Sequence, residues 1–160
     1  MDTGHLHLML NHLPVLGVPA LLALLVWGLA RDVPTVARAA LWLTLALSVV
    51  TAVVYLTGEA AEELIEGLPT FDESLVERHE GVALWTTVVI VATGLLAAAA
   101  LYGSARRGVQ GSRALIRLVV AGLALSTVAV GVTAWTGGPI GHPELRQGGI
   151  GERTGSVEAD

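Results

Sequence analysis

Long apolar segments alternate with short polar connections along most of this chain. Four such segments are present, at 6–30, 36–57, 72–102 and 113–136. Each contains close to the roughly 20 apolar residues that a helix needs to cross a bilayer core about 30 Å thick. Because short connections favour antiparallel neighbours, the pattern predicts an all-α, integral membrane, up-and-down antiparallel four-helix bundle over residues 1–146. Residues 147–160 are polar and rich in glycine, which predicts a flexible tail.

Composition agrees with a membrane protein and argues against several other classes. The 160 residues are 53% hydrophobic and 14% charged, with a mean hydropathy of +0.68. There is no cysteine, which excludes disulfides and thiolate metal sites. A net charge of −5 without a basic stripe argues against nucleic acid as a partner. The start, MDTGHLHLML, lacks the positive region of a secretory signal, so we expect the first segment to stay as a span.

Arginine is distributed unequally between the two sides of the predicted bundle. Six arginines lie in or beside the first and third connections: Arg31, Arg38, Arg106, Arg107, Arg113 and Arg117. Three lie on the other side: Arg78, Arg146 and Arg153. The positive-inside rule makes the side with six arginines cytoplasmic. We therefore expect a multi-pass protein of the bacterial cytoplasmic (inner) membrane with both termini extracytoplasmic.

All five histidines fall on the predicted extracytoplasmic side. His5, His7 and His12 precede the first span, His79 begins the third, and His142 follows the fourth. Helical spacing places His7 on a different face from His12, where we expect it to contact lipid headgroups. The same spacing directs His12 and His79 into the bundle. One such histidine alone is ordinary at a membrane interface, but the gathering of all five indicates a site.

Carboxylates accompany these histidines. The segment TGEAAEELIEG, 57–67, would place four glutamates on one face of a helix that continues the second span: Glu59, Glu62, Glu63 and Glu66. A solvated acidic rim explains most of them. Glu59 differs because it lies within one helical turn of Tyr55, and an ionisable group so close to the hydrocarbon is a functional candidate.

Two further segments shape the same end of the bundle. Thr70 and Glu73 have the spacing of a capping box, which predicts that the third helix begins near Phe71. At the other end of the chain, 137–139 has the sequence Gly-Gly-Pro, which predicts the end of the last helix. A tight turn there would fold His142 and Glu144 back over the mouth of the bundle.

The motifs NHLPVLG, TGEAAEE, RHE and TGGPIGHPEL together resemble an uncharacterised bacterial family of four-span integral membrane proteins. Members of that family share an N-H-x-P motif, a T-G-E-x-A-E-E motif, an H-E pair and a closing H-P-E. The resemblance covers residues 5–146 and implies that these positions belong together. It implies no particular activity.

Two cofactor sites are compatible with these residues. In the first, His12 and His79, on diagonally opposed helices, are axial ligands of a haem b that serves electron transfer. Arg78 and Arg146 would then be available to the propionates. In the second, a single Zn, Fe or Cu ion is bound by imidazoles and a carboxylate. Its ligands would be His12, Glu59, His79 and His142, with Glu63 or Glu144 behind them.

A third interpretation is a non-catalytic scaffold or accessory subunit of a larger membrane complex. Proton-coupled transport is disfavoured, because the spans carry no charged residue near their centres. No nucleophile–base pair or phosphate loop stands out, so no independent enzymatic activity is predicted. The expected partners are the lipid bilayer, membrane or periplasmic redox proteins, and a second copy of the chain.

Overall fold

Every regular element in the part of the chain that the structure describes is a helix. The computed structural model describes residues 3–146, without the side chains of 107–111, so the predicted tail at 147–160 lies outside it. The elements are α1 (Thr3–Leu10), α2 (His12–Ala30), α3 (Pro34–Leu56), α4 (Gly58–Glu62), α5 (Glu73–Gly111), α6 (Arg113–Gly141) and the 3₁₀ helix η1 (Pro143–Leu145). Within the described residues, four stretches are long and apolar enough to cross a membrane: Thr3–Ala30, Pro34–Leu56, Glu73–Arg106 and Arg113–Gly141. The predicted helical class and its four long apolar helices are confirmed.

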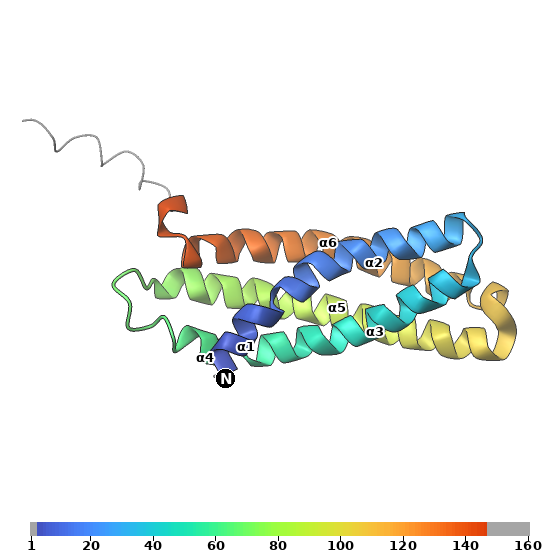
Figure 1. The fold of residues 1–160 in the computed structure, drawn as a ribbon, viewed down its shortest axis with the longest axis horizontal. Coiled ribbons are helices and arrows are strands. Elements are labelled where there is room, and N and C mark those ends of the chain that lie inside the picture. The colour runs from blue at the N-terminus through green and yellow to red at the C-terminus, as the bar shows by residue number, and fades with distance from the viewer. Residues whose placement is uncertain (1–2, 147–160) are drawn as a thin grey trace, which may run out of the picture.

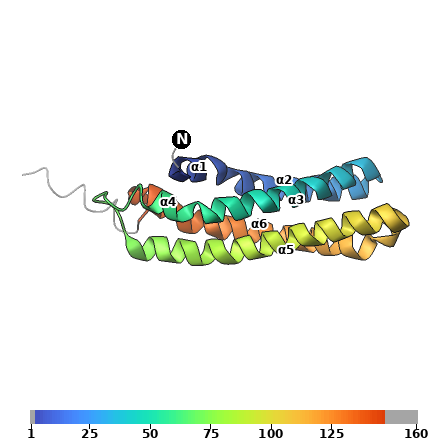
Figure 2. The same ribbon diagram turned by 90° about the horizontal axis from the view of Figure 1, so that it is seen from below.

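The four long helices pack in a closed ring. Both α2 and α5 contact α3 and α6, so α2 lies diagonally opposite α5. Connections between consecutive long helices alternate between the two ends of the molecule (Figure 1). Turned by 90°, the molecule shows two layers, with α2 and α3 in one and α5 and α6 in the other (Figure 2). The chain therefore consists of two helical hairpins packed face to face.

Close backbone approach and hydrogen-bonded threonines are found in the interior between the helices. A Cβ on Gly122 would lie 2.5 Å from Oγ1 of Thr93, so α5 and α6 can approach this closely only because position 122 has no side chain. Thr93 in turn donates its hydroxyl proton to the carbonyl oxygen of Val89, one turn back, at 2.8 Å. Threonine can therefore be buried here without leaving a donor unpaired.

The two hairpins repeat each other, which sequence reasoning had missed. An aromatic residue followed by Gly-x-Ala-Arg lies at the end of α2, at 27–31, and shortly before the end of α5, at 102–106. A Thr-Gly pair follows α3 directly, at 57–58, and another lies in the last two turns of α6, at 136–137. The glycines make matching contacts, since a Cβ on Gly28 would lie 3.0 Å from the backbone nitrogen of Ala37, and one on Gly103 would lie 2.6 Å from Oγ of Ser112. Because both hairpins start at the same end, the repeat is a parallel one, about an approximate twofold axis along the bundle.

Three predictions about helix ends are wrong: the capping residue of the third long helix, the continuity of the acidic helix with the second span, and the end of the last helix. The third long helix begins at Glu73 because Asp72, rather than Thr70, caps it: Oδ1 of Asp72 accepts hydrogen bonds from the backbone N–H and the hydroxyl of Ser74, at 3.1 and 2.7 Å. The acidic helix breaks at Thr57 and α4 then ends at Glu62, so the four glutamates do not share one continuous helical face. The last helix continues through Pro139 to Gly141, since a proline in a final turn removes only one helical hydrogen bond.

Candidate functional site

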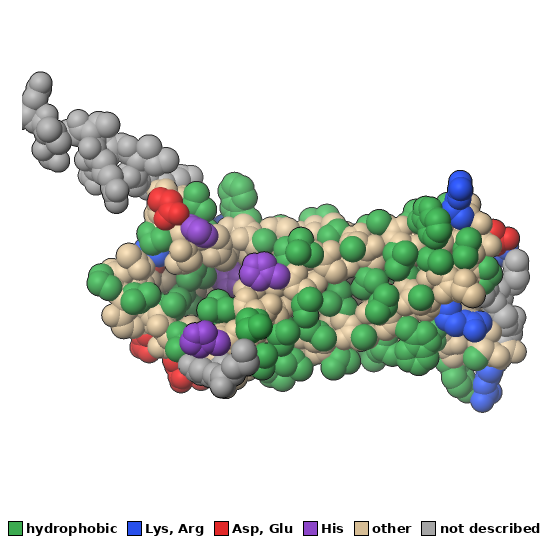
Figure 3. Space-filling view, in the orientation of Figure 1, with side chains coloured by type: hydrophobic (Ala, Val, Ile, Leu, Met, Phe, Trp, Pro, Cys, Tyr) green, Lys and Arg blue, Asp and Glu red, His purple; other side chains and the backbone are tan. Residues whose placement is uncertain are grey.

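Charged and imidazole side chains gather at opposite ends of the bundle. The end that carries α1, α4, the 63–72 connection and η1 displays histidine and carboxylate side chains, while arginines cluster at the other end (Figure 3). We call these the histidine end and the arginine end. The sequence likewise predicted the histidines at one end of the bundle and most of the arginines at the other.

His7 lies inward, against the last turn of α3. Its Nδ1 is 2.8 Å from the carbonyl oxygen of Val54 and 3.4 Å from Oγ1 of Thr57. A carbonyl oxygen can only accept, so Nδ1 carries the proton and donates it. The other ring nitrogen, Nε2, then has a free lone pair while the ring is neutral. The prediction that His7 faces away from the bundle, towards headgroups, is wrong.

His79 turns towards the bundle from α5, as its spacing with Leu75 and Val82 predicted. The ring is partly buried, and its Nδ1 lies 3.2 Å from Oγ1 of Thr136 on α6. The Thr136 hydroxyl donates its own proton to the carbonyl oxygen of Thr133 at 3.0 Å, so it accepts a hydrogen bond from Nδ1–H of His79. His79 therefore has the same tautomer as His7, with Nε2 as a free lone pair.

The two imidazoles occupy equivalent places in the repeat. Each one packs against the Thr-Gly pair at or near the end of the second helix of its own hairpin. A Cβ on Gly58 would lie 3.8 Å from Cε1 of His7, and a Cβ on Gly137 would lie 3.0 Å from Cε1 of His79. The two rings are close enough to interact electrostatically with each other. The structure thus brings together His7 and His79, one from each hairpin.

Asn11 lies one helical turn from His7, between α1 and α2. Its backbone N–H donates to the carbonyl oxygen of His7 at 2.9 Å, so the two side chains project from the same face of the chain. Its side-chain oxygen, Oδ1, is buried and has no hydrogen-bond partner among the described residues. Three buried serine hydroxyls, of Ser104, Ser112 and Ser126, also have no partner among the described residues, but Asn11 differs from them because it lies one turn from His7. Its Oδ1 could accept from a donor or cation supplied from elsewhere.

His12 is exposed, and the prediction that it points into the bundle is wrong. The inward-facing positions of α2 are Pro14, Val18, Leu21 and Leu25, which recur at helical spacing. His12 lies off that stripe. His5, seven residues earlier, is exposed as well, so the face that carries His5 and His12 is directed away from the bundle.

The predicted carboxylate ligands lie on the rim of the histidine end. Glu59 and Glu63 are both exposed, because the break at Thr57 starts a new short helix instead of continuing α3. Their neighbour Glu62 has a pKa above its usual value, owing to desolvation first and then to the negative charge of Glu80. The prediction of a Glu59 carboxylate buried beside the spans is wrong.

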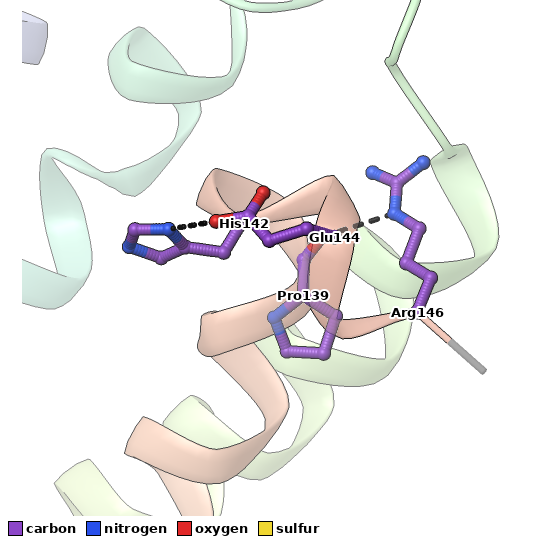
Figure 4. Close-up of polar contacts among 4 residues, drawn as sticks. All are labelled: Pro139, His142, Glu144 and Arg146. Carbon is purple, nitrogen blue, oxygen red and sulfur yellow. Dashed lines mark hydrogen bonds and ion pairs between the residues drawn. The ribbon is translucent and has the colours of Figure 1, made fainter. Parts of the chain in front are cut away.

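His142 and Glu144 pair with each other in solvent rather than closing over the mouth of the bundle. Nδ1 of His142 is 3.0 Å from Oε1 of Glu144, and their side chains are 65% and 68% exposed (Figure 4). The pKa of Glu144 is lowered by a hydrogen bond from its own backbone N–H and then by His142. Over the residues that the structure covers, no three His, Asp or Glu side chains form a group able to hold a metal ion. The predicted four-ligand shell is therefore not assembled.

The two arginines predicted near haem propionates lie in different surroundings. Arg146 reaches back over η1, where its Nε donates to the carbonyl oxygen of Pro139 at 3.0 Å (Figure 4) and its Nη2 to that of Thr70 at 2.8 Å. It fastens the connection before α5 to the end of α6. Arg78 is exposed and lines a groove between α5 and α6.

No protein-family model, curated protein or solved structure matches this chain. The chemistry of the site is therefore argued from its own residues. Those residues are two imidazoles that donate through Nδ1 and leave Nε2 available, and one buried amide oxygen without a partner among the described residues.

Proposed function

We propose that this chain is an integral protein of the bacterial inner membrane that binds haem b between His7 and His79 and serves electron transfer. The proposal is supported by the matching hydrogen bonds that hold the two imidazoles, one in each repeat, through Nδ1 and leave both Nε2 atoms available. Imidazole Nε2 is a usual axial ligand of haem iron. His7 takes the place that sequence reasoning had given to His12.

The surroundings of the two rings suit such a group. A hydrogen bond from Nδ1–H to a carbonyl or hydroxyl oxygen fixes the orientation of a ligating histidine and makes Nε2 more basic. Gly58 and Gly137 leave the edges of both rings clear of side chains. When bound, haem would supply one-electron redox chemistry, while the protein contributes the ligands, their orientation and an apolar environment.

The membrane placement rests on the four apolar helices and on the charge asymmetry. Arginine at one end of the bundle supports an up-and-down bundle with that end in the cytoplasm. Both termini and the histidine end would then be extracytoplasmic. The cofactor would lie at that surface, within reach of other membrane or periplasmic redox proteins.

A single transition-metal ion is the second candidate, and Asn11 favours it. Two imidazole nitrogens and one amide oxygen form a donor set compatible with Zn, Cu(II) or Fe. The unpartnered Oδ1 of Asn11 would gain a cation as its partner. Haem needs no third protein ligand, so Asn11 would be required for binding of a metal ion but not for binding of haem.

The cofactor content of the purified protein distinguishes haem binding, metal-ion binding and the scaffold interpretation. Protein extracted from membranes in mild detergent would be measured by absorption, before and after reduction, and by elemental analysis. A b-type reduced spectrum with one iron per chain supports haem, and stoichiometric metal without that spectrum supports the ion site. Neither haem nor metal would contradict both cofactor proposals and leave the scaffold interpretation, in which the polar residues bond to neighbouring subunits.

A further inference from the structure

A groove of about 530 Å³ runs along the seam between α5 and α6. Its walls are mostly apolar and include Val82, Trp85 and Leu125, while the small residues Gly81 and Ala129 leave the hollow between the helices. Two charged residues, Glu77 and Arg78, line it as well. In the proposed bilayer it would open sideways into the extracytoplasmic leaflet.

The charged residues lie nearer to the histidine end than any other part of the groove, because they precede the rest of the α5 lining along the helix. Both side chains are exposed, and neither makes a hydrogen bond or ion pair to another described residue. Arg146 differs, since its Nε and Nη2 already donate to backbone carbonyls. The carboxylate of Glu77 and the guanidinium of Arg78, without partners among the described residues, thus lie together at the polar end of an apolar groove.

This arrangement matches a ligand that has one charge of each sign on a short polar head and a long apolar chain. A zwitterionic phospholipid offers a phosphate, which guanidinium binds well, and an ammonium group, which a carboxylate accepts. A purely anionic lipid would place its charge beside Glu77 and the other exposed carboxylates at this end, Glu73 and Glu80. The charges therefore favour the zwitterion.

We propose that the α5–α6 groove is a binding site for a zwitterionic phospholipid with a primary ammonium headgroup, such as phosphatidylethanolamine. Its phosphate lies on Arg78, its ammonium on Glu77, and one acyl chain follows the trough past Gly81 and Trp85. The proposal rests on the membrane placement given above but not on haem. The groove would bind this lipid in preference to the other lipids of the surrounding bilayer.

Trp85 provides the readout, because it lines the groove and its fluorescence is quenched by brominated acyl chains that touch it. The other three tryptophans, Trp27, Trp42 and Trp135, are exposed and can be replaced by phenylalanine. This single-tryptophan protein would be reconstituted into vesicles that contain brominated phosphatidylethanolamine, phosphatidylcholine or phosphatidylglycerol at equal mole fraction. We expect the relative affinity obtained from Trp85 quenching to be about two- to tenfold higher for phosphatidylethanolamine than for phosphatidylglycerol. Two exposed charge pairs would contribute a difference of this size.

Substitutions identify the source of that preference. Arg78→Gln and Glu77→Gln should each reduce it, whereas Arg117→Gln and Glu80→Gln, exposed charges outside the groove lining, should not. Gly81→Leu should abolish it without disturbing the fold, because a Cβ at Gly81 would meet nothing within 4 Å.

The failure outcomes are distinct. Equal quenching by all three lipids, or a preference for phosphatidylglycerol that only Arg78→Gln removes, would overturn the zwitterion site. No quenching by any lipid would contradict the membrane placement itself.

Discussion

Nδ1 of His7 and the carbonyl oxygen of Val54 are joined by a hydrogen bond of 2.8 Å. The carbonyl belongs to the last turn of α3, and it also accepts from the backbone N–H and the hydroxyl of Thr57, at 3.2 and 2.9 Å. The bond ties α1 to α3 and sets the tautomer of the imidazole. In the other hairpin the hydroxyl of Thr136 does the same for His79, at 3.2 Å.

Thr136→Val should weaken cofactor binding without removing a ligand. Nδ1–H of His79 would lose its acceptor, so the ring would be less fixed and Nε2 less basic. For partners of this kind the affinity falls on the order of 10–100-fold. Titration of the cofactor-free protein measures this. Thr136→Ser, which restores the hydroxyl, is the matched control, and equal affinities for the Val and Ser variants would show that the hydrogen bond has no role.

Asn11→Ala separates haem from a metal ion. If Oδ1 of Asn11 is a ligand to an ion, the variant should retain much less metal, and Asn11→Asp, which supplies a charged oxygen, should retain more. If haem is bound by the two imidazoles alone, both variants should keep it. Metal and haem content, measured side by side, give the answer. Metal content that is the same in all three proteins would rule Asn11 out as a ligand.

Gly4→Ala should loosen α1, the helix that carries His7. A Cβ at Gly4 would lie 2.5 Å from the carbonyl oxygen of Ala60 and closer still to the side chain of Leu64. The helix would have to move away from α4, at a cost of about 1–3 kcal/mol for such overpacking. Thermal unfolding and cofactor retention should both decline. Gly81→Ala is the control because its new methyl group meets nothing within 4 Å, and an equal effect of the two changes would contradict close α1–α4 packing.

Asp72 should make the start of α5 sensitive to acid. The Ser74 hydroxyl, foremost, lowers the pKa of Asp72 below its ordinary value of 3.8. A carboxylate whose folded pKa is depressed contributes stability above that ordinary value, and the contribution is lost as the pH falls through the lowered pKa. Wild type should therefore lose more stability than Asp72→Asn when acidified below pH 3.8. Thermal midpoints against pH measure the difference between the two proteins, and parallel curves would show that Asp72 is not the cap.

The four long helices could be predicted from the sequence because hydrophobic length is a local property. The inward direction of His79 could also be predicted, because neighbouring apolar positions on the same helix show which side of that helix faces the bundle. His7 and His12 were interchanged because the wrong face of the first span was taken as the inward one. The backbone stays helical through Asn11, and the buried residues Gly4 and Pro14 share the face of His7, whereas His12 lies on another face.

Other parts of the site depend on contacts between distant segments. Arg146 binds the carbonyl oxygen of Thr70, 76 positions away, and no local pattern indicates such a bond. The paired Thr-Gly sequences at 57–58 and 136–137 are different, because they were readable in the sequence. A search for internal repeats would have linked each of them to the histidine at the start of its own hairpin.

Haem content of His7→Ala, His79→Ala and His12→Ala, each normalised to protein and compared with wild type, tests the central claim most directly. All three substitutions remove one imidazole from the same end of the bundle, but His12 is exposed and serves as the matched control. We predict that His7→Ala and His79→Ala lose the b-type spectrum while His12→Ala keeps it. Loss of the spectrum in His12→Ala, with His7→Ala unaffected, would contradict the site built from His7 and His79.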